Sequence, residues 1–336
     1  MKAILKVAAE KGAVELREVP DAAPGEGEVV LKVAAASICG SDLHFYNWDP
    51  VAQGFFTPPM VMGHEFAGTV VATGRGAEGV REGDRVTVES VVSCGVCLTC
   101  RRGDSHLCRN RRLFGIHRPG GMAEYVAAPA GLLHVVPAEL PVEHAAIVEP
   151  TVVALHAVLR QPPRPGDVVL VMGPGPVGLL AGQAAKAAGA EVFVSGTPAD
   201  AAKRLPIARK LGLRTLDPQA PLQWSLPAPA DLVLECSGSA RAFDSALQAV
   251  RPGGAITLLG LFAAPIQADL SAAIRKEVSL RTSYIGTWQD FNRAIQLLAD
   301  GAIQVAPLLQ PYRLEDALTG FEDAMQQRVM KPLLIP

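Results

Sequence analysis

The sequence lacks several features that would place it in particular classes of protein. It has no stretch of about 18 consecutive apolar residues, so no transmembrane helix is expected. Positive and negative charges nearly cancel, with a formal net charge of −2, so nothing electrostatic favours nucleic acid or an anionic membrane as a partner. Residues 1–16 contain no cleavage signature and are typical of a strand and hairpin rather than a signal peptide. We therefore expect a cytoplasmic protein.

Two kinds of pattern divide the 336 residues, which are too many for one ordinary hydrophobic core. Up to about residue 150, short valine-rich segments such as EVVLKVAAASI alternate with glycine and proline, which predicts a mostly β domain. From about residue 165, buried strands alternate with helices, which predicts a parallel sheet covered on both faces. Helices are expected over residues 200–212 and 241–254, and two more near the end of the chain.

Four of the six cysteines are clustered in SCGVCLTCRRGDSHLC, at Cys94, Cys97, Cys100 and Cys108. Gaps of two residues let thiolates converge on one ion, and four thiolates suit tetrahedral zinc. Because the protein fills all four positions, we expect a closed structural site. Disulfides or loose thiols are the alternative, but both are disfavoured in a reducing cytosol. His106 lies within the cluster and is expected at the surface.

A dinucleotide fingerprint, GPGPVG at residues 173–178, directly follows the strand-like VVLVM and opens an alanine-rich helix. Gly173 permits the tight turn, Gly175 lets the backbone approach a pyrophosphate, and Gly178 lets the helix pack on the strand. The free N–H groups of the helix N-terminus favour phosphate. A plain glycine turn is the alternative. We also expect Pro176, Val177 and Ser237 to be cofactor-binding residues.

The end of the next strand bears on the choice between NAD and NADP. An NAD site usually has an acidic residue there, about 20 residues after the glycines, and this chain has none. NADP is therefore slightly favoured, with Lys203 and Arg204 as partners for its 2′-phosphate or, equally, as a solvated helical turn. Asp200 is expected to be a helix N-cap. The residues at the strand end are Ser195, Gly196 and Thr197.

A second set of metal-ligand types is dispersed along the chain. Cys39 lies in SICGSDLH, His64 and Glu65 in VMGHEFAG, and Glu149 in IVEP. One thiolate, one imidazole and one carboxylate with an open position are typical of a catalytic zinc, with Glu65 a fourth ligand or a second-shell partner. Taken singly, His64 or Glu149 is equally typical of an ordinary hydrogen-bonded residue. Spacing alone does not bring these residues together.

Over essentially its whole length, the chain resembles the zinc-dependent medium-chain dehydrogenases of the alcohol, sorbitol and threonine dehydrogenase type. ICGSDLH, GHEFAGTVVATG, GDRV, the cysteine cluster, GGMAEYV, VEP and GPGPVG carry the resemblance. It implies an α/β protein with a GroES-like, mostly β catalytic domain over 1–150 that includes a zinc lobe at about 90–112. A doubly wound Rossmann domain follows over 151–287, and residues 288–336 return to the catalytic domain.

The resemblance also implies an activity and a set of roles. Cys39, His64 and Glu149 would bind the catalytic zinc, with Glu65 a ligand or neighbour. Zinc would lower the pKa of an alcohol so that an alkoxide forms and passes hydride to the nicotinamide. Ser41 would receive the hydroxyl proton and His44 would relay it towards solvent.

The substrate expected from the sequence is a polyol, a sugar acid or a simple secondary alcohol. The segment HFYNWDP is closest to threonine dehydrogenases, which makes L-threonine the runner-up. Against threonine, Val91 stands where those enzymes commonly have a histidine, and no partners for an amino acid's charged groups are evident. Four aromatic residues are candidates either for the pocket or for the core. They are Phe45, Trp48, Phe55 and Trp288.

Two further expectations concern assembly and the possibility of no catalysis. The resemblance implies a homodimer or homotetramer, and the segment EVSLRTSYIG at 277–286 is a candidate edge for pairing across a two-fold axis. A non-catalytic nucleotide-binding homologue would have lost zinc ligands or the proton relay. All of these residues are present, so the sequence favours an enzyme with two zinc ions and NADP or NAD.

Overall fold

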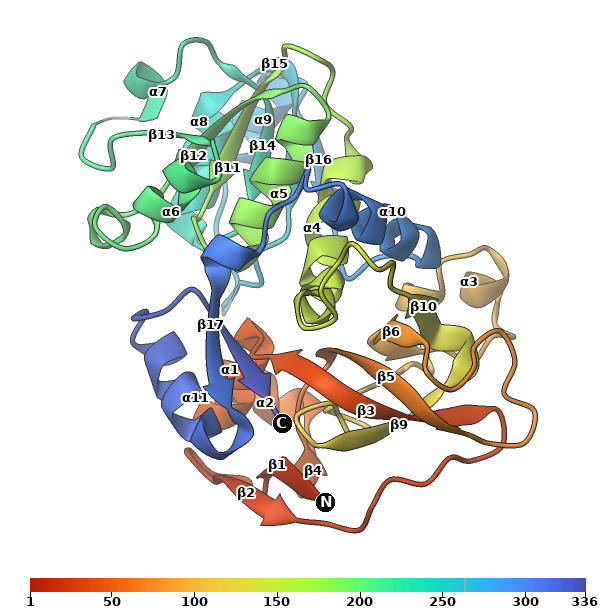
Figure 1. Cartoon of the computed structure of the whole chain (residues 1–336). Coiled ribbons are helices and arrows are strands. Elements are labelled where there is room, and N and C mark those ends of the chain that lie inside the picture. The colour runs from red at the N-terminus through yellow and green to blue at the C-terminus, as the bar shows by residue number, and fades with distance from the viewer. Residues whose placement is uncertain (221, 263) are drawn as a thin grey trace. The chain divides into compact units, whose positions relative to one another are not determined.

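The computed structural model describes residues 1–220, 222–262 and 264–336 (Figure 1). The chain forms two compact units. The first comprises Met1–Glu149, Thr287–Ala299 and Leu308–Pro336, and the second Pro150–Gly286 and Asp300–Pro307. We expected residues 288–336 to join the first unit as one piece, but Asp300–Pro307 groups with the second. Hydrogen bonds explain this, because the Gln183 amide accepts from Gln304 N (2.8 Å) and donates to Gln304 O (3.2 Å).

The first unit is built on a seven-stranded sheet. Its strands run in the order β10-β6-β5-β3-β18-β17, and β9 also pairs with β3. The antiparallel pairing of β18 with β3 places Leu333 opposite Ser37, so the C-terminal strand lies beside the strand that leads to Cys39. The strands are β3 (Glu28–Ser37), β5 (Glu65–Thr73), β6 (Arg85–Val88), β9 (Tyr125–Pro129), β10 (Leu133–Val135), β17 (Leu309–Arg313) and β18 (Lys331–Ile335).

Smaller elements complete the first unit. The expected N-terminal hairpin is present as β1 (Lys2–Lys6) and β2 (Val14–Glu18), and β4 (Met60–Val61) joins it to make three strands. The cysteine-rich lobe contains β7 (Val91–Val92), α3 (Leu98–Arg101) and β8 (Arg112–Leu113). The remaining helices of this unit are α1 (Gly40–Asn47), α2 (Pro50–Phe55), α10 (Trp288–Ala299) and α11 (Ala317–Met325).

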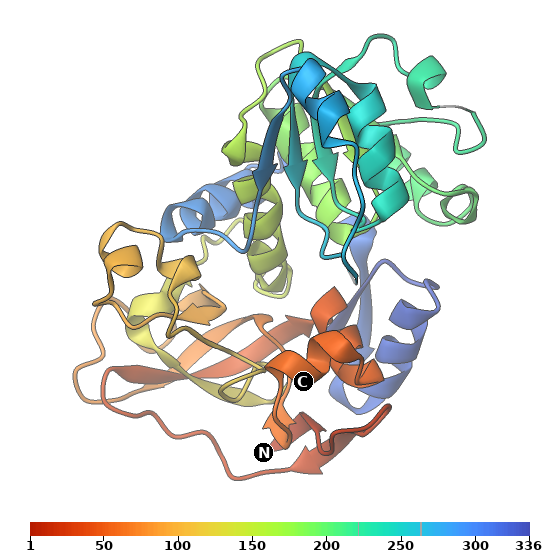
Figure 2. The ribbon, with the colours of Figure 1, turned by 180° about the vertical axis from the view of Figure 1, so that it is seen from behind.

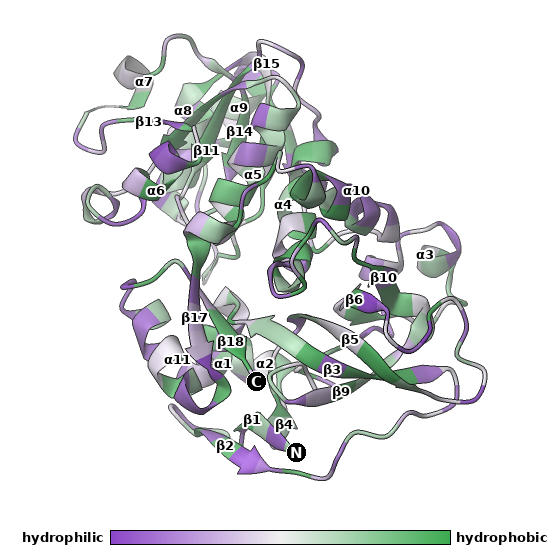
Figure 3. Cartoon of the chain, viewed as in Figure 1, coloured by the Kyte–Doolittle hydropathy of each residue, from purple (hydrophilic) through white to green (hydrophobic). Residues whose placement is uncertain are grey.

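The second unit has a six-stranded, wholly parallel sheet in the order β13-β12-β11-β14-β15-β16. In chain order this is 3-2-1-4-5-6, the arrangement of doubly wound dinucleotide-binding domains. Helix α5 (Pro176–Ala187) lies on one face and α8 (Ala240–Ala249) on the other (Figures 1 and 2). The central strands are apolar and buried (Figure 3). The strands are β11 (Val168–Met172), β12 (Glu191–Ser195), β13 (Arg214–Thr215), β14 (Ala230–Glu235), β15 (Val250–Leu258) and β16 (Ser279–Thr282).

Two helices of the second unit are shorter than predicted, and prolines explain both differences. The expected helix over 200–212 is α6 (Leu205–Lys210), in which Pro206 occupies the first turn, where its missing N–H costs nothing. Helix α8 ends at Ala249, and residues 250–254 begin β15, because Pro252 cannot donate within a helix. The other helices are α4 (Val148–Arg160), α7 (Leu222–Ser225) and α9 (Leu270–Arg275). Within the described ranges, no helix is long and apolar enough to cross a membrane.

Candidate active site

Strand pairing brings two distant ligand candidates of the first unit together. Cys39 follows β3 as the N-cap of α1, and His64 directly precedes β5. Since β3 and β5 are antiparallel neighbours with Ser37 opposite Glu65, the two segments lie side by side. Gly63 has φ +94°, a conformation that only glycine adopts without strain, and it turns the chain into β5 at His64.

The side chains of Cys39, His64 and Glu65 converge, with one potential ligand atom from each within 4.8 Å of the others. His64 and Glu65 are buried. Ser41, in the first turn of α1, places its Oγ 3.4 Å from His64 Nε2. A thiol, an imidazole and a carboxylate are a donor set that zinc accepts.

Glu149 is buried in the first turn of α4 and lies outside this close trio. Ser90 Oγ donates a hydrogen bond of 2.8 Å to its Oε1. Burial, with a smaller contribution from the nearby charge of Glu65, raises the pKa of Glu149 to about 6. Glu149 therefore lies close enough to His64 and Glu65 to interact with them electrostatically.

The electrostatics of the cluster match a divalent cation. Burial alone would lower the pKa of His64, but the charges of Cys39, Asp42 and Glu149 raise it well above its usual value. Several anionic groups around one imidazole leave a negative site that a zinc ion would neutralise. Both the donor set and the charge therefore fit zinc.

Asp42, to which the sequence assigned only local capping, also lies beside the candidate metal ligand His64. Its Oδ2 accepts from Cys39 N at 2.9 Å, which completes a capping box at the start of α1. Its Oδ1 lies 3.9 Å from His64 Nδ1. Burial raises the pKa of Asp42. At this distance the two atoms form no hydrogen bond, so Asp42 acts on His64 through its charge.

Lys331 is a charged residue of the site that the sequence analysis missed. It is buried at the start of β18, and its Nζ lies 2.5 Å from Glu65 Oε2 and donates to Ile38 O at 3.0 Å. Ser37 Oγ donates to the same Glu65 oxygen. Burial would lower the pKa of Lys331, but the charges of Glu65, Cys39 and Asp42 and the hydrogen bond to Glu65 together raise it. The signal in the sequence was one lysine preceding the apolar segment PLLIP.

Replacing Lys331 with methionine should destabilise the protein by about 3–5 kcal/mol, because it leaves Glu65 as an unpaired buried charge. Urea unfolding of the whole protein measures this loss in the free energy of unfolding. The Lys331→Met/Glu65→Gln double variant should recover much of it, since both charges are then gone. If the single variant unfolded at the wild-type urea concentration, the pair would have no stabilising role.

His44 lies in the last turn of α1, and its Nδ1 hydrogen-bonds Asp49 Oδ2. Because a carboxylate only accepts, Nδ1 carries the proton and Nε2 is available as an acceptor when the ring is neutral. Asp49 Oδ1 also accepts from Val51 N and Ala52 N as the N-cap of α2. Hydrogen bonds from His44 and from this helix lower the pKa of Asp49 despite its partial burial.

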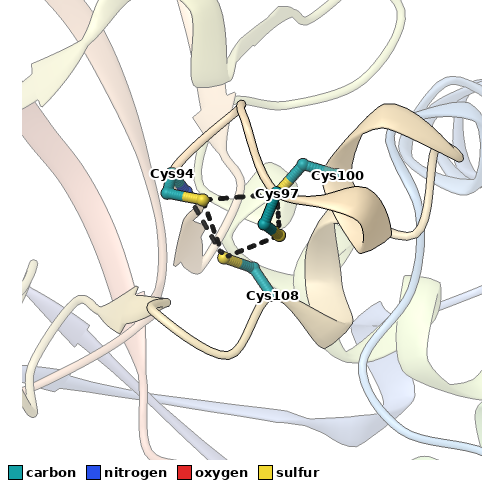
Figure 4. Close-up of side chains that lie close together, drawn as sticks. All are labelled: Cys94, Cys97, Cys100 and Cys108. Atoms are coloured by element: carbon teal, nitrogen blue, oxygen red, sulfur yellow. Dashed lines mark hydrogen bonds between the residues drawn. The ribbon is translucent and has the colours of Figure 1, made fainter.

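The four clustered cysteines point at a common centre (Figure 4). Their Sγ–Sγ distances are 3.4 Å (Cys97–Cys100), 3.5 Å (Cys94–Cys108), 3.9 Å (Cys97–Cys108) and 4.0 Å (Cys94–Cys100). Zinc–sulfur bonds of about 2.3 Å in a tetrahedron separate the sulfurs by about 3.8 Å, in the middle of this range. A disulfide needs about 2.05 Å, and all four cysteines are free. The arrangement fits a closed zinc site.

The placement of His106 corrects one expectation. We predicted a surface residue, but its exposed fraction is only 5%. His106 lies in a single 3₁₀ turn, Ser105–Leu107, between Cys100 and Cys108. The chain turns inward there, because Cys108 is fully buried. His106, two residues earlier, is buried with it.

The glycine fingerprint lies in the second unit between β11 and α5, in the required strand–turn–helix order. Gly173 has φ +101°, and a Cβ at Gly178 would lie 2.0 Å from Gly173 O, so neither position accepts another residue without strain. Gly175 is the N-cap of α5, and Pro176 and Val177 form its first turn. Ser237 lies against Gly173, since a Cβ on that glycine would lie 3.0 Å from the serine Cβ.

The loop after β12 differs from expectation in its capping. Thr197, not Asp200, is the N-cap of the short 3₁₀ helix Pro198–Asp200, and Asp200 occupies its N3 position. Asp200 Oδ2 accepts from Thr197 N (2.8 Å) and Oγ1 (2.7 Å), and its Oδ1 lies 3.8 Å from Arg204. Ser195 Oγ donates to Val171 O, and Lys203 is exposed. Neither Asp200 nor Arg204 is therefore fully available to a ligand.

The four aromatic candidates for the substrate pocket are in different environments. Phe45 is core, because it is buried and its ring centroid lies 4.8 Å from that of Phe56. Trp48 is half-buried and caps the C-terminus of α1 in the left-handed conformation. Phe55 and Trp288 have exposed fractions of 48% and 53%, which leaves them as the candidates able to meet a ligand.

Comparison with known proteins identifies two domain families and many relatives. Residues 25–138 match the alcohol dehydrogenase GroES-like domain, and residues 176–300 match the zinc-binding dehydrogenase domain. The chain is 38% identical over 318 residues to an L-threonine 3-dehydrogenase of Pyrococcus furiosus, covering 92% of this chain and 90% of the relative. It is 35% identical to a sorbitol dehydrogenase of Halalkalibacterium halodurans, covering 100% of this chain and 99% of that one.

Solved structures of similar proteins match the whole chain. A zinc-binding dehydrogenase from Sinorhizobium meliloti 1021 bound to NADP is 31% identical, with a TM-score of 0.92, covering 100% of this chain and 99% of that one. The 2R,3R-butanediol dehydrogenase of Bacillus subtilis is 28% identical, with a TM-score of 0.89 and the same coverage. A dehydrogenase from E. coli CFT073 complexed with NADH is 29% identical, with a TM-score of 0.91 and again the same coverage.

Proposed function

The chain belongs to the zinc-dependent medium-chain dehydrogenases, and we propose that it oxidises the secondary hydroxyl of a polyol, a sugar acid or a simple alcohol with NAD(P). The observation that carries the proposal is the convergence of Cys39, His64 and Glu65 within 4.8 Å, with Ser41 beside His64. The second unit supplies a glycine fingerprint of dinucleotide-binding form. The confirmed expectations are therefore the family, the fold class and the need for zinc and a nicotinamide dinucleotide.

Each residue of the first unit has a role in this proposal. Cys39, His64 and Glu149 hold the catalytic zinc, which when bound polarises the substrate oxygen and lowers the pKa of the hydroxyl. Ser41 accepts the hydroxyl proton, and its position beside His64 keeps it next to the metal ligands. His44 receives the proton at Nε2 because Asp49 holds the other ring nitrogen protonated.

Glu65 is proposed as the neighbour of this metal rather than a permanent ligand. Its Oε2 is already engaged by Lys331 and Ser37, which leaves only Oε1 for a metal. The pairing of Glu65 with Lys331 cancels one negative charge next to the zinc. Cys94, Cys97, Cys100 and Cys108 hold the second, structural zinc in a lobe without an open coordination position.

A substrate panel tests the proposed function. Simple secondary alcohols, polyols, sugar acids and L-threonine are each incubated with NAD or NADP, and the reduced nicotinamide is followed by absorbance. We expect the highest kcat/KM for a substrate without an α-amino acid group. Oxidation of none of these substrates with either cofactor would contradict the proposal.

L-Threonine is the second candidate, and relatives favour it. The Pyrococcus furiosus relative, 38% identical, is an L-threonine 3-dehydrogenase. Against threonine, Val91 is a buried apolar residue on β7 and offers no hydrogen bond to an ammonium or carboxylate group. Efficient turnover of threonine with NAD alone would reverse the ranking.

We propose NADP as the slightly preferred cofactor, with Lys203 the main partner for its 2′-phosphate. Lys203 is exposed, whereas Arg204 already faces Asp200. Asp200 is in turn engaged by Thr197, so it is not a free acceptor for a ribose 2′-hydroxyl. The relative from Sinorhizobium meliloti is bound to NADP.

Lys203→Ala should raise the KM for NADP roughly 10-fold and leave the KM for NAD unchanged, because one charge-assisted contact to phosphate is lost. Initial rates with each cofactor at saturating alcohol measure both values. Lys210→Ala, an exposed lysine at the end of α6, is the matched control and should leave both cofactors unaffected. Equal values for Lys203→Ala and wild type with NADP would exclude Lys203 from the 2′-phosphate site.

We further propose a cytoplasmic homodimer or homotetramer. Strand β16 within residues 277–286 is an edge of the parallel sheet, and the side chain of Leu280 is 45% exposed. An exposed edge strand is able to pair with a second copy across a two-fold axis. Light scattering that detected a monomer at working concentrations would contradict this assembly.

A further inference from the structure

Glu235 is a buried carboxylate to which neither the metal sites nor the glycine fingerprint assign a role. It ends β14 in the middle of the parallel sheet, opposite Met172 of β11 and Leu258 of β15, and its exposed fraction is 0%. Among the described residues, no lysine, arginine or histidine forms an ion pair with it. A buried charge without a cation persists only where hydrogen bonds satisfy it.

All the hydrogen bonds that the described residues donate to this carboxylate come from the loop that follows β14. Ser237 N donates to Oε1 at 2.9 Å, Ser237 Oγ donates to the same oxygen, and Gly238 N donates to Oε2 at 3.0 Å. Ser237 Oγ also accepts from Ser239 N, the N-cap of α8. The Glu235 side chain thus fixes the conformation of residues 236–239.

Glu235 also fixes the neighbouring loop after β15. Its backbone oxygen accepts from Leu259 N (2.8 Å) and Gly260 N (3.0 Å). The two loops touch backbone to backbone, because a Cβ at Gly260 would lie 2.0 Å from Gly238 N and 2.8 Å from Glu235 Oε2. Both loops leave the carboxyl ends of parallel strands, the edge at which doubly wound sheets bind their ligands.

The loop held by Glu235 lies directly against the glycine fingerprint. Cβ and N of Ser237 would lie 3.0 and 3.1 Å from a Cβ on Gly173, and Cys236 N donates to Met172 O at 2.9 Å. We propose that Glu235 is a positioning residue for the nicotinamide dinucleotide: its buried carboxylate holds residues 236–239 in the shape that the cofactor meets. The inference rests on the proposed function, since it requires that the second unit bind NAD(P).

Glu235→Gln tests this role, because it conserves size and removes the charge. One amide oxygen can still accept from Ser237, but the amide NH₂ then faces the Gly238 N–H, donor against donor. The loop must shift, and we expect the Kd for NADPH and NADH, measured by fluorescence titration, to rise at least about 10-fold. In steady-state assays the KM for cofactor should rise while the zinc content and the KM for the alcohol stay unchanged.

A control on the same strand separates positioning from stability. Asp231 is another carboxylate of β14, near its amino end, where it accepts from Val168 N (2.8 Å) and Arg251 Nε (2.6 Å). Asp231→Asn should lower the Tm yet keep the cofactor Kd within about two-fold of wild type. A wild-type Kd in Glu235→Gln, or an equal rise in Asp231→Asn, would overturn the inference.

Two further outcomes bear on the role of Glu235. If Glu235→Gln does not fold, Glu235→Asp keeps the charge but withdraws the carboxylate from Ser237 and Gly238, and it should raise the Kd about threefold or more. An unchanged Kd in that variant would overturn the inference. If the wild-type protein bound neither NADPH nor NADH, the proposed function itself would fail, whereas normal binding by the wild type and the Glu235 variant would refute the positioning role alone.

Discussion

Replacing Cys39 with alanine is expected to reduce kcat/KM by about three orders of magnitude or more and to remove one zinc equivalent per chain. Cys39 is the only thiol of the catalytic cluster, and the two other members, His64 and Glu65, are an imidazole and an already paired carboxylate. Without the thiolate, the site would lose one of its proposed zinc ligands. Initial rates and zinc analysis of the same preparation measure the two effects.

Cys236→Ala is the matched control for this experiment. Cys236 lies at the end of a strand in the second unit, is outside both metal clusters, and has a pKa raised by burial and the nearby charge of Glu235. Its replacement should leave two zinc ions per chain, and because Cys236 lies in the loop that Glu235 positions, only the zinc content serves as the control. Full activity in the Cys39 variant after complete removal of zinc would exclude the zinc-dependent mechanism.

Replacing Cys108 with serine is expected to remove the other zinc ion and to lower the Tm by roughly 10 °C. Loss of a structural metal is among the changes that cost more than about 4 kcal/mol, and each kcal/mol corresponds to about 2–4 °C for units of this size. Cys108 is the fully buried member of the four-sulfur cluster and lies 3.5 Å from Cys94 Sγ. Differential scanning calorimetry with zinc analysis measures the change.

The control for Cys108 lies in the same lobe. Val96 is 69% exposed between Cys94 and Cys97, so Val96→Ala should change neither the Tm nor the metal content. In the Cys108 variant the remaining zinc should stay in the cluster of Cys39. A variant with two zinc ions and an unchanged Tm would show that the four sulfurs do not hold a structural metal.

The contrast between the two clusters of candidate metal ligands shows what the sequence alone predicts. The four-cysteine cluster was predictable because its ligands lie within 15 consecutive residues, where the local chain geometry already limits the distances. The catalytic cluster was not, because Cys39 and His64 approach only through the pairing of β3 with β5. There, family resemblance supplied what the spacing of the residues did not contain.

Local capping and burial were harder to predict than the elements themselves. Asp200 was expected to be the N-cap, but Thr197 occupies that position, since hydroxyl and carboxylate are both good caps. His106 was expected outside and is inside, because the burial of its neighbour Cys108 determines the path of the turn. In both cases the residue type allowed either outcome, and the packing of the folded chain decided which one occurs.

By itself the sequence determined the two domain types, the four-cysteine cluster and the glycine fingerprint, because each is encoded in contiguous residues with a period or spacing of its own. The tertiary structure alone decided that Lys331 meets Glu65 and that Glu235 holds the loop beside Gly173. Lys331 donates to Ile38, 293 positions earlier in the chain. The physical reason is that the stability of a buried charge depends on the groups around it. Strand pairing can bring those groups from distant parts of the chain.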